Sequence, residues 1–400
     1  MKRFLQAHAT HPDWRYALAM VQPQLEAQRR ERATFEPTLG WVYLTDHYAG
    51  QAEALLAELQ RHWPGVAWVG CDGVGVAASG VEYFDEPALT VMLAELPRSD
   101  FRVFSGARPL GSFAAHVAQV HADPATPELA DLLTDMSDRT ATGYLFGGLA
   151  SARNRTLHIA DAVLSGGLSG VAFSNAVGLV SRVTQGCQPV GRARTVTEST
   201  GNVVTRLDGE PALECLLADL GVAGREPREV LPQIRQTLVG LADPAERSAD
   251  APSARRGAFG PDTRVRHLIG LDPGRGGIAI GDHAPEGLEL AFCQRHTEAA
   301  RRDLVRICAE IREELAPEDL PLATTLPGGG TPEPAESGIA GAVYVSCSGR
   351  GGPHFGAPSA ELQIVRRALG DVPLVGFFAA GEIARHHLYG YTGVLTVFRA

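Results

Sequence analysis

The sequence predicts an α/β or α+β fold with two mixed-sheet lobes and flanking helices. Short β-type runs alternate with helical stretches along the chain, as in layered folds of this class. The 400 residues exceed one typical domain and suggest two or three. Apolar residues make up 44% and charged residues 20%, so the chain supplies a sizeable core, which disfavours bulk disorder.

The first predicted unit is a strand, a helix and a second strand. Residues 41–45 (WVYLT) have the composition of a strand, and 51–63 place apolar residues at helical spacing. Pro64 and Gly65 end that helix, and a second strand follows over 66–70. Because a right-handed crossover between parallel strands is the default for such a unit, we expect parallel pairing. A third strand is expected over 90–96.

The remaining elements follow from the same patterns. β-type segments are expected at 143–148, 170–173, 178–183, 202–207, 266–271, 277–281, 338–348, 373–381 and 393–399. Helices are expected at 211–220, 297–315 and 359–369. The Pro/Gly/Ser/Ala-biased segments 248–262 and 321–337 are expected to be mobile loops or linkers. We place the domain boundary between domains 1–210 and 211–400.

A short sequence pattern recurs weakly in the two halves of the chain. GYLFGGLAS (143–151) followed by GLVSRV (178–183) resembles VGFFAAGEI (375–383) followed by GVLTVF (393–398). Both pairs have the order strand, glycine turn, irregular segment, strand. A duplicated domain and convergent turn chemistry explain the recurrence equally well.

Charge and cysteine usage exclude several classes of protein. The formal charge of −10 and a pI near 5.7, without a basic tract, argue against nucleic acid or anionic membrane as a partner. No apolar run approaches the ~20 residues needed to span a bilayer. Six cysteines without any CxxC pair argue against a disulfide framework or a zinc knuckle. We therefore expect a cytoplasmic protein.

The common catalytic templates are missing from the sequence. The only lysine is Lys2, which excludes a pyridoxal Schiff base and a GxxxxGK[ST] phosphate loop. GxSxG and HExxH are also absent. No pair among the 13 histidines has convincing metal-ligand spacing.

The most concentrated group of candidate residues lies at 346–352 (SCSGRGG). Cys347, Gly349, Arg350 and Gly351 follow a β-type run there. Glycines let a ligand approach the backbone closely, and the arginine fork suits an anionic group. A tight turn with Cys347 as a small core residue is an equally good interpretation.

Two further strand ends carry candidate binding residues. Phe378, Gly381 and Glu382 end an apolar strand, and a carboxylate near the core must be paired or protonated, whether it serves structure or a ligand. The third group ends the strand at 66–70 and comprises Gly70, Cys71 and Gly75. Cys71 and Cys347 hold similar positions relative to their strands, so the two half-sites could face one cleft.

Taken in order, these segments resemble the FIST family, a two-part sensory module. FIST-N-like segments are AHATHPDW (7–14), HWPGVAWVGCDGVGV (62–76), YLFGGLA (144–150) and VTQGCQPVG (183–191). FIST-C-like segments are VSCSGRG (345–351), PLVGFFAAGEIA (373–384) and GYTGVLTVF (390–398). The motif residues carried over are Gly70, Cys71, Gly75, Gly186, Cys187, Pro189, Gly191, Cys347, Gly349, Arg350, Gly351, Phe378, Gly381 and Glu382.

The resemblance implies a non-enzymatic sensor of a small ligand, acting through a separate partner. Proposed ligands in the family include amino acids, and a subset of relatives binds haem, responds to nitric oxide and acts on a histidine kinase. Relatives often have a histidine before the final Gly-Tyr-Thr, where this chain has Tyr389. Tyr389 and His387 are therefore the haem-ligand candidates here.

Three hypotheses stay open, in this order. The first is a sensor whose pocket uses Arg350 for an anionic group and Glu382 for a cationic one, as an amino acid would require. The second is a haem-based nitric-oxide sensor regulating a histidine kinase. The third is an uncharacterised enzyme with Cys347 or Cys71 as nucleophile.

Overall fold

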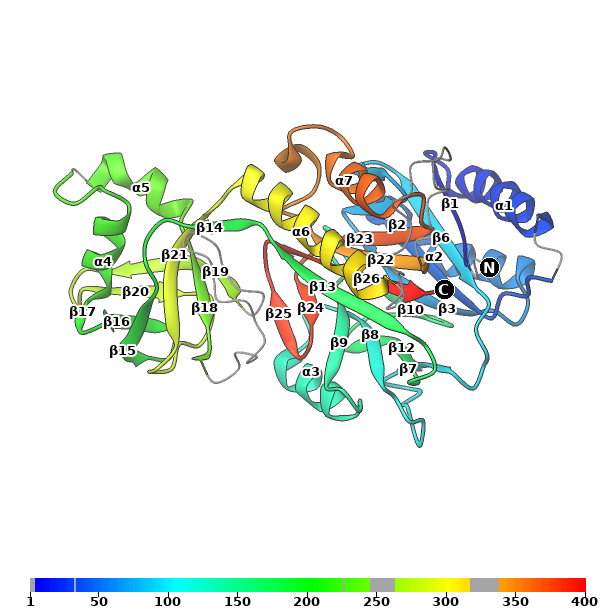
Figure 1. The fold of residues 1–400 in the computed structure, drawn as a ribbon, viewed down its shortest axis with the longest axis horizontal. Coiled ribbons are helices and arrows are strands. Elements are labelled where there is room, and N and C mark those ends of the chain that lie inside the picture. The colour runs from blue at the N-terminus through cyan, green and yellow to red at the C-terminus, as the bar shows by residue number, and fades with distance from the viewer. Residues whose placement is uncertain (1–3, 32–33, 226, 245–262, 317–337) are drawn as a thin grey trace, which may run out of the picture. The chain divides into compact units, whose positions relative to one another are not determined.

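The chain folds into two compact units in a computed structural model that describes residues 4–31, 34–225, 227–244, 263–316 and 338–400 (Figure 1). The first unit comprises Met1–Thr184, Arg301–Leu388 and Thr392–Ala400. The second comprises Gln185–Ala300 and Tyr389–Tyr391. The expected loops at 248–262 and 321–337 lie outside the described residues, and the sequence boundary at 210/211 stays a prediction.

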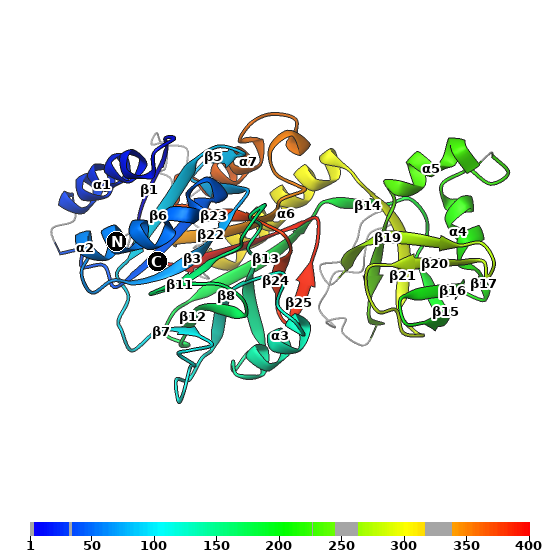
Figure 2. The ribbon, with the colours of Figure 1, turned by 180° about the vertical axis from the view of Figure 1, so that it is seen from behind.

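The first sheet of the first unit has the order β1-β6-β2-β3-β10-β11. Its strands are β1 (Phe4–Thr10), β6 (Ala88–Ala94), β2 (Leu39–Thr45), β3 (Ala67–Gly73), β10 (His158–Ala160) and β11 (Val163–Leu164). Helices α1 (Trp14–Arg30) and α2 (Ala52–His62) cover one face, as Figure 1 and Figure 2 show. Every residue of β2 is buried, because the opposite face is also covered.

Two further sheets complete the first unit. One has the order β25-β24-β9-β8-β12-β7 and carries α3 (Leu129–Asp138); the other has the order β13-β26-β22-β23-β4-β5 and carries α7 (Ala360–Leu369). Strands of the former are β7 (Phe101–Ser105), β8 (Val117–Ala122), β9 (Tyr144–Leu149), β12 (Leu168–Phe173), β24 (Glu382–Ala384) and β25 (His387–Tyr389). Strands of the latter are β4 (Gly75–Ala78), β5 (Val81–Phe84), β13 (Leu179–Gln185), β22 (Ile339–Cys347), β23 (Leu374–Ala379) and β26 (Thr392–Arg399).

Aromatic side chains pack the first sheet against the sheet that contains β22, β23 and β26. Phe398 contacts both Phe4 and Trp41, and Tyr43 stacks on Phe377 with ring centroids 5.1 Å apart. Aromatic pairs at such distances add stabilisation beyond the apolar area that they bury. The first unit is thus layered, with helices outside and sheets packed face to face inside.

A parallel strand pair with a helix in its connection occurs three times in the first unit. The pairs are β2–β3, β8–β9 and β22–β23, connected through α2, α3 and α7. In each pair a glycine lies opposite the centre of the first strand: Gly70 opposite Val42, Gly147 opposite Val120 and Gly376 opposite Tyr344. A Cβ on any of the three would lie 1.7–1.9 Å from the opposing carbonyl oxygen. The two repeated sequence segments contain β9 and nearly all of β23, the second strands of two of these three pairs.

The second unit is a set of antiparallel strands with two helices. Its strand order is β14-β21-β15-β16-β20-β19-β18, with β17 beside β16. The strands are β14 (Cys187–Pro189), β15 (Arg194–Thr200), β16 (Val203–Leu207), β17 (Glu210–Pro211), β18 (Leu238–Ala242), β19 (Arg264–Asp272), β20 (Gly277–Ile280) and β21 (Glu289–Arg295). Helices α4 (Ala212–Asp219) and α5 (Pro227–Arg235) bury apolar side chains against it.

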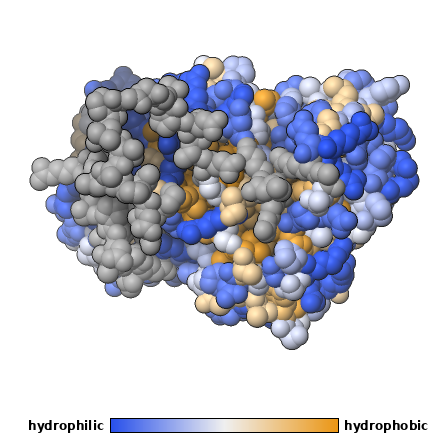
Figure 3. Space-filling model, turned by 45° about the vertical axis from the view of Figure 1, so that its right-hand side comes forward, coloured by the Kyte–Doolittle hydropathy of each residue, from blue (hydrophilic) through white to orange (hydrophobic). Residues whose placement is uncertain are grey.

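The predicted fold class is confirmed, and so is the parallel pairing of the first predicted unit. Helix α6 (Thr297–Leu315) has the predicted bounds. Strand β1 and helix α1 were not predicted from the sequence. None of the helices in the described part of the chain is long and apolar enough to cross a bilayer. Some apolar side chains nevertheless reach the surface, and Figure 3 shows them gathered among hydrophilic residues on one face.

Candidate functional site

The carboxyl ends of β3, β9 and β23 meet in the first unit. A Cβ on Gly73 would lie 3.0 Å from Ser151 Oγ and 3.1 Å from the Phe378 carbonyl oxygen. Ser151 Oγ donates to that carbonyl and accepts a hydrogen bond from the Val74 backbone N–H at 3.1 Å. In α/β sheets, ligands bind outside the carboxyl ends of the strands, where the connections diverge. We call this region the carboxyl edge.

Phe378 lies between the glycines of two predicted motif segments. A Cβ on Gly75 would lie 2.8 Å from its ring, and a Cβ on Gly351 would lie 2.1 Å from it. The Phe84 ring packs edge-on against Phe378 at 5.1 Å between centroids. The glycines are therefore needed so that the backbone can approach this aromatic ring. Two of the ten candidate ligand-binding residues, Gly75 and Gly351, thus contact the side chain of a third, Phe378.

Glu382, at the start of β24, is fully buried and lies beside other candidate residues. Its Oε2 accepts hydrogen bonds from Thr392, at 2.7 Å from the hydroxyl and 3.1 Å from the backbone N–H. Its Oε1 has no partner among the described residues. Burial raises the pKa of Glu382 to about 8, against the opposing effects of Thr392, Arg350 and Cys347. This carboxyl is thus mostly protonated at neutral pH.

Arg350 is buried and engaged by other protein groups. Its Nε donates to Glu361 at 2.7 Å, and its two terminal nitrogens donate to the carbonyl and hydroxyl of Thr184, both at 3.2 Å. Glu361 also accepts hydrogen bonds from Tyr344 at 2.6 Å and Ser346 at 3.0 Å. This network joins β22 to α7. Recognition of an anionic ligand by Arg350 stays a prediction.

Gly70 and Cys71, on β3, are also buried. The Cys71 side chain is fully buried, and burial raises the pKa of its thiol well above the usual range. By register, Cys71 corresponds to Phe377 of β23, whereas Cys347 is on the first strand of its pair. The two cysteines are thus on non-equivalent strands.

A cavity of about 420 Å³ opens beside the carboxyl edge. Its polar lining comes from Asp46 and Glu53, near the start of α2, and from Asn154 and Arg155, in the loop after β9. Leu157 and Val163 contribute apolar wall. None of the described residues that line this cavity is among the ten binding residues predicted from the sequence. Direct contact of those ten residues with a ligand therefore stays a prediction.

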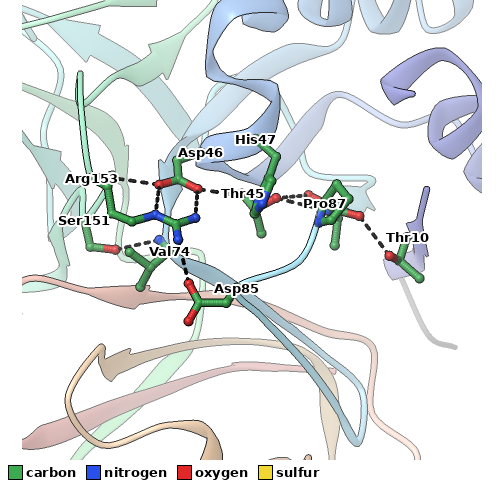
Figure 4. Close-up of polar contacts among 10 residues, drawn as sticks. Thr10, Thr45, Asp46, His47, Val74, Asp85, Pro87, Ser151 and Arg153 are labelled. Carbon is green, nitrogen blue, oxygen red and sulfur yellow. Dashed lines mark hydrogen bonds and ion pairs between the residues drawn. The ribbon is translucent and has the colours of Figure 1, made fainter. Parts of the chain in front are cut away.

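Arg153 holds the wall of this cavity together (Figure 4). It makes a two-point ion pair with Asp46, at 2.8 Å from Nε and 2.7 Å from a terminal nitrogen. Its other terminal nitrogen donates to Asp85 at 2.9 Å. The hydrogen bonds from Arg153 lower the pKa of Asp46 and keep it ionised. The clamp fixes the loop that carries Asn154 and Arg155.

Asp72 lies fully buried behind the cavity wall. Its Oδ1 accepts a hydrogen bond from the backbone N–H of the wall residue Leu157 at 3.0 Å, and its Oδ2 has no partner among the described residues. Burial, together with the charge of nearby Asp46, raises the pKa of Asp72 to about 7. The carboxyl edge therefore holds a buried acid that a bound cation would stabilise in its ionised form.

The sequence analysis missed Asp46, Asn154, Arg155 and the clamp residue Arg153. Its own rule, which gives weight to polar residues directly after a strand, was sufficient to find them. Asp46 directly follows WVYLT, and SARNR (151–155) directly follows YLFGGLA.

The haem-ligand candidates His387 and Tyr389 are the first and last residues of β25. His387 is half-buried and belongs to the first unit, whereas Tyr389 is buried and is counted with the second. Neither residue belongs to the recorded lining of the cavity at the carboxyl edge. No group of three or more His, Cys, Asp and Glu side chains suited to a metal ion occurs within the described ranges. Haem ligation by this pair stays a prediction.

Comparison with known proteins links the whole chain to one family. Residues 38–210 match the FIST N domain and residues 212–385 match the FIST C domain. The chain is 32% identical over 409 residues to "Uncharacterized protein Rv0628c" of Mycobacterium tuberculosis (strain ATCC 25618 / H37Rv), covering 98% of both proteins. It is 30% identical over 407 residues to "Uncharacterized protein Mb0898c" of Mycobacterium bovis (strain ATCC BAA-935 / AF2122/97), covering 97% of both.

Proposed function

This chain belongs to the FIST family, whose domains are sensory domains associated with signal transduction, and we propose that it senses a free amino acid and signals through a separate partner protein. The carboxyl-edge cavity carries this proposal. It lies where strands of the recurring parallel pairs end, beside the convergence of the FIST motif segments. Its volume of about 420 Å³ lies at the small-molecule end of the usual range for ligand pockets.

The charges on the cavity wall favour a zwitterion. Arg155 offers a guanidinium to an α-carboxylate, and the Asn154 amide adds neutral hydrogen-bonding capacity. Glu53 and Asp46 offer carboxylates to an ammonium group, and that ammonium group would favour the ionised form of the buried acid Asp72. A ligand with only a carboxylate would leave Glu53 and Asp46 without a counter-charge, and a ligand with only an ammonium group would leave Arg155 without one.

Signal transmission needs a difference between the free and ligand-bound chain. The loop 151–157 contains cavity wall at Asn154 and Arg155, and Ser151 at its start bonds to β23 through the Phe378 carbonyl. Ligand bound to the wall would favour one arrangement of this loop and of the strands joined to it. The partner would respond to that change in population.

Isothermal titration calorimetry against single amino acids tests the proposal. For an amino acid that binds, we expect the matching amine and the matching acid, each lacking one charge, to bind at least about tenfold more weakly. Arg155→Gln and Glu53→Gln should weaken binding, whereas Arg61→Gln, on the exposed face of α2, should not. Equal binding of the amino acid by all three variants would refute this assignment of the site.

The third hypothesis, a cysteine-dependent enzyme, gains no support from the site. All six cysteines are free and buried. Burial raises the pKa of Cys71, so its thiolate, the nucleophilic form, is disfavoured.

A further inference from the structure

A second cavity in the first unit lies at the amino ends of β8 and β9, whereas the carboxyl edge lies at the other end of β9. This second cavity has a volume of about 350 Å³ and is lined by residues at the amino ends of β8 and β9, in the turn before β13 and on β26. Val117, Phe146, Val177 and Leu179 provide its apolar walls. We call it the amino-edge cavity; the sensory site proposed above uses none of these residues.

The charge of this lining differs from that of the carboxyl-edge cavity. Arg399 and His116 line it, and none of the described residues that line it carries a carboxylate. This is notable in a chain of formal charge −10, in which acidic side chains outnumber basic ones by 46 to 36. A terminal nitrogen of the Arg399 guanidinium donates to Glu314 at 3.3 Å, which leaves its other donors for a ligand. Its side chain is 48% exposed, so an added anion can reach it.

Neutral polar groups in the cavity add further hydrogen-bond donors to the guanidinium of Arg399. Among the described residues, neither the His116 ring nor the Asn175 amide has a hydrogen-bonding partner. Three hydroxyls form a cluster: Ser181 and Thr396 are 2.8 Å apart, and Tyr144 bonds to Ser181. Donors from guanidinium, imidazole, amide and hydroxyl groups suit the oxygens of a carboxylate.

We propose that the amino-edge cavity is a second ligand site, for a small organic carboxylate with an apolar body and no ammonium group. The apolar walls receive the body, and Arg399 with its neighbouring donors receives the carboxylate. An ammonium group would find no acidic partner among the described lining residues, so free amino acids are disfavoured here. The two cavities therefore select different ligands.

Calorimetric titration of the full chain with benzoate, benzyl alcohol and benzylamine tests this site. These probes share one ring and differ in the charge of the polar group. We expect benzoate to bind with a stoichiometry of one, and benzylamine to bind at least about tenfold more weakly. Equal affinity for the anion and the amine would overturn the proposal.

Variants at the two cavities locate the bound benzoate. Val177→Trp fills the apolar wall and should abolish binding, and Arg399→Gln should weaken it about tenfold or more. His116→Gln, at a partly exposed position, serves if Val177→Trp does not fold. Arg155→Gln, in the carboxyl-edge cavity, should leave benzoate affinity within about twofold. Unchanged affinity in Arg399→Gln, or loss in Arg155→Gln, would contradict the assignment.

The outcome is independent of the sensory site. Failure of amino acids to bind the carboxyl-edge cavity would leave benzoate binding and its dependence on Arg399 intact. Loss of the second site would likewise leave the response of amino-acid binding to Arg155→Gln unchanged.

Discussion

Arg153 grips Asp46 through two parallel hydrogen bonds and thereby joins the loop after β9 to the end of β2, 107 positions earlier in the chain. Asp46 is itself part of the cavity wall, and Asn154 and Arg155 directly follow Arg153. The same arginine reaches Asp85, after β5. One side chain thus connects three segments at the carboxyl edge. Its role in the proposed site is to position the wall residues.

Replacing Arg153 with alanine should loosen the loop without unfolding the unit. The side chain is 50% exposed, and a solvent-screened ion pair contributes about 1 kcal/mol or less to stability. We expect a small decrease in the free energy of unfolding and faster hydrogen exchange at the backbone amides of residues 153–157. Mass spectrometry of exchanged peptides measures the second effect directly.

Arg61→Ala provides the matched control for this variant. Arg61 forms an exposed ion pair with Glu58 on α2, at 2.7 Å, and has no contact with the loop. Exchange at residues 153–157 should be the same in this control as in the parent chain. Equal exchange rates in Arg153→Ala and the parent chain would show that the clamp does not order the loop.

The buried acid Glu382 predicts a particular pH dependence of stability. Its pKa is about 8 in the folded chain and near 4.5 in its ordinary state, so the folded chain retains a proton that the unfolded chain releases. The stability that this group contributes is complete below about pH 4.5 and is lost as the pH rises towards 8. Glu382→Gln mimics the protonated acid and removes this titration.

Urea denaturation at pH 5 and pH 8 tests that sign. The stability of Glu382→Gln relative to the parent chain should increase between the two values. Glu58→Gln is the control, because Arg61 lowers the pKa of Glu58 and places its titration below this pH range. A relative stability of Glu382→Gln that stays constant, or decreases, would mean that the carboxyl is ionised in the folded chain.

Sequence patterns predicted the parallel unit β2–α2–β3 because its periodicities are local. The apolar spacing of the helix and the two strand runs are all visible within residues 41–70, and their parallel pairing follows from the default right-handed crossover. The segment AHATHPDW was interpreted only as a motif, so the strand and helix that it joins were missed.

The site was less predictable because its partners are distant in sequence. Thr184 is 166 positions before Arg350, and no local pattern pairs them. The sequence indicated that Arg350 could bind an anion, whereas the structure shows it bound to Glu361 within the protein. The convergence of Gly75, Gly351 and Phe378 likewise depends on β4, β23 and β22 lying side by side in one sheet, although β4 is far from the other two strands in the sequence. Strand-end chemistry directed attention to the carboxyl edge, and tertiary packing decided which residues there face the cavity.

The glycine that recurs in the three parallel pairs should be intolerant of any side chain. In Gly376→Ala the new Cβ would lie 1.7 Å from the Tyr344 carbonyl oxygen, which is backbone and cannot rotate away. We expect a loss of about 3 kcal/mol or more in the free energy of unfolding, or no folded protein. Chemical denaturation measures the loss.

Gly106→Ala is the control for that substitution. A Cβ on Gly106 would meet nothing within 4 Å, and the position has no positive φ. Its stability should therefore equal that of the parent or exceed it by up to about 1 kcal/mol, because alanine restricts the unfolded chain. Equal stability of the two variants would show that β22 and β23 separate readily to admit a methyl group.

The buried ion pair between Arg350 and Glu361 distinguishes a structural role from direct ligand binding. The two side chains are 1% and 0% exposed, so removing one leaves an uncompensated charge in the core. Arg350→Met alone should cost roughly 3–5 kcal/mol, and Arg350→Met combined with Glu361→Gln should cost less, because the unpaired carboxylate is then gone. A double-mutant cycle from denaturation curves measures this coupling. If Arg350 acts only within the fold, the double variant recovers amino-acid binding together with stability. Recovery of stability without recovery of binding would instead favour the role in ligand recognition that the sequence suggested.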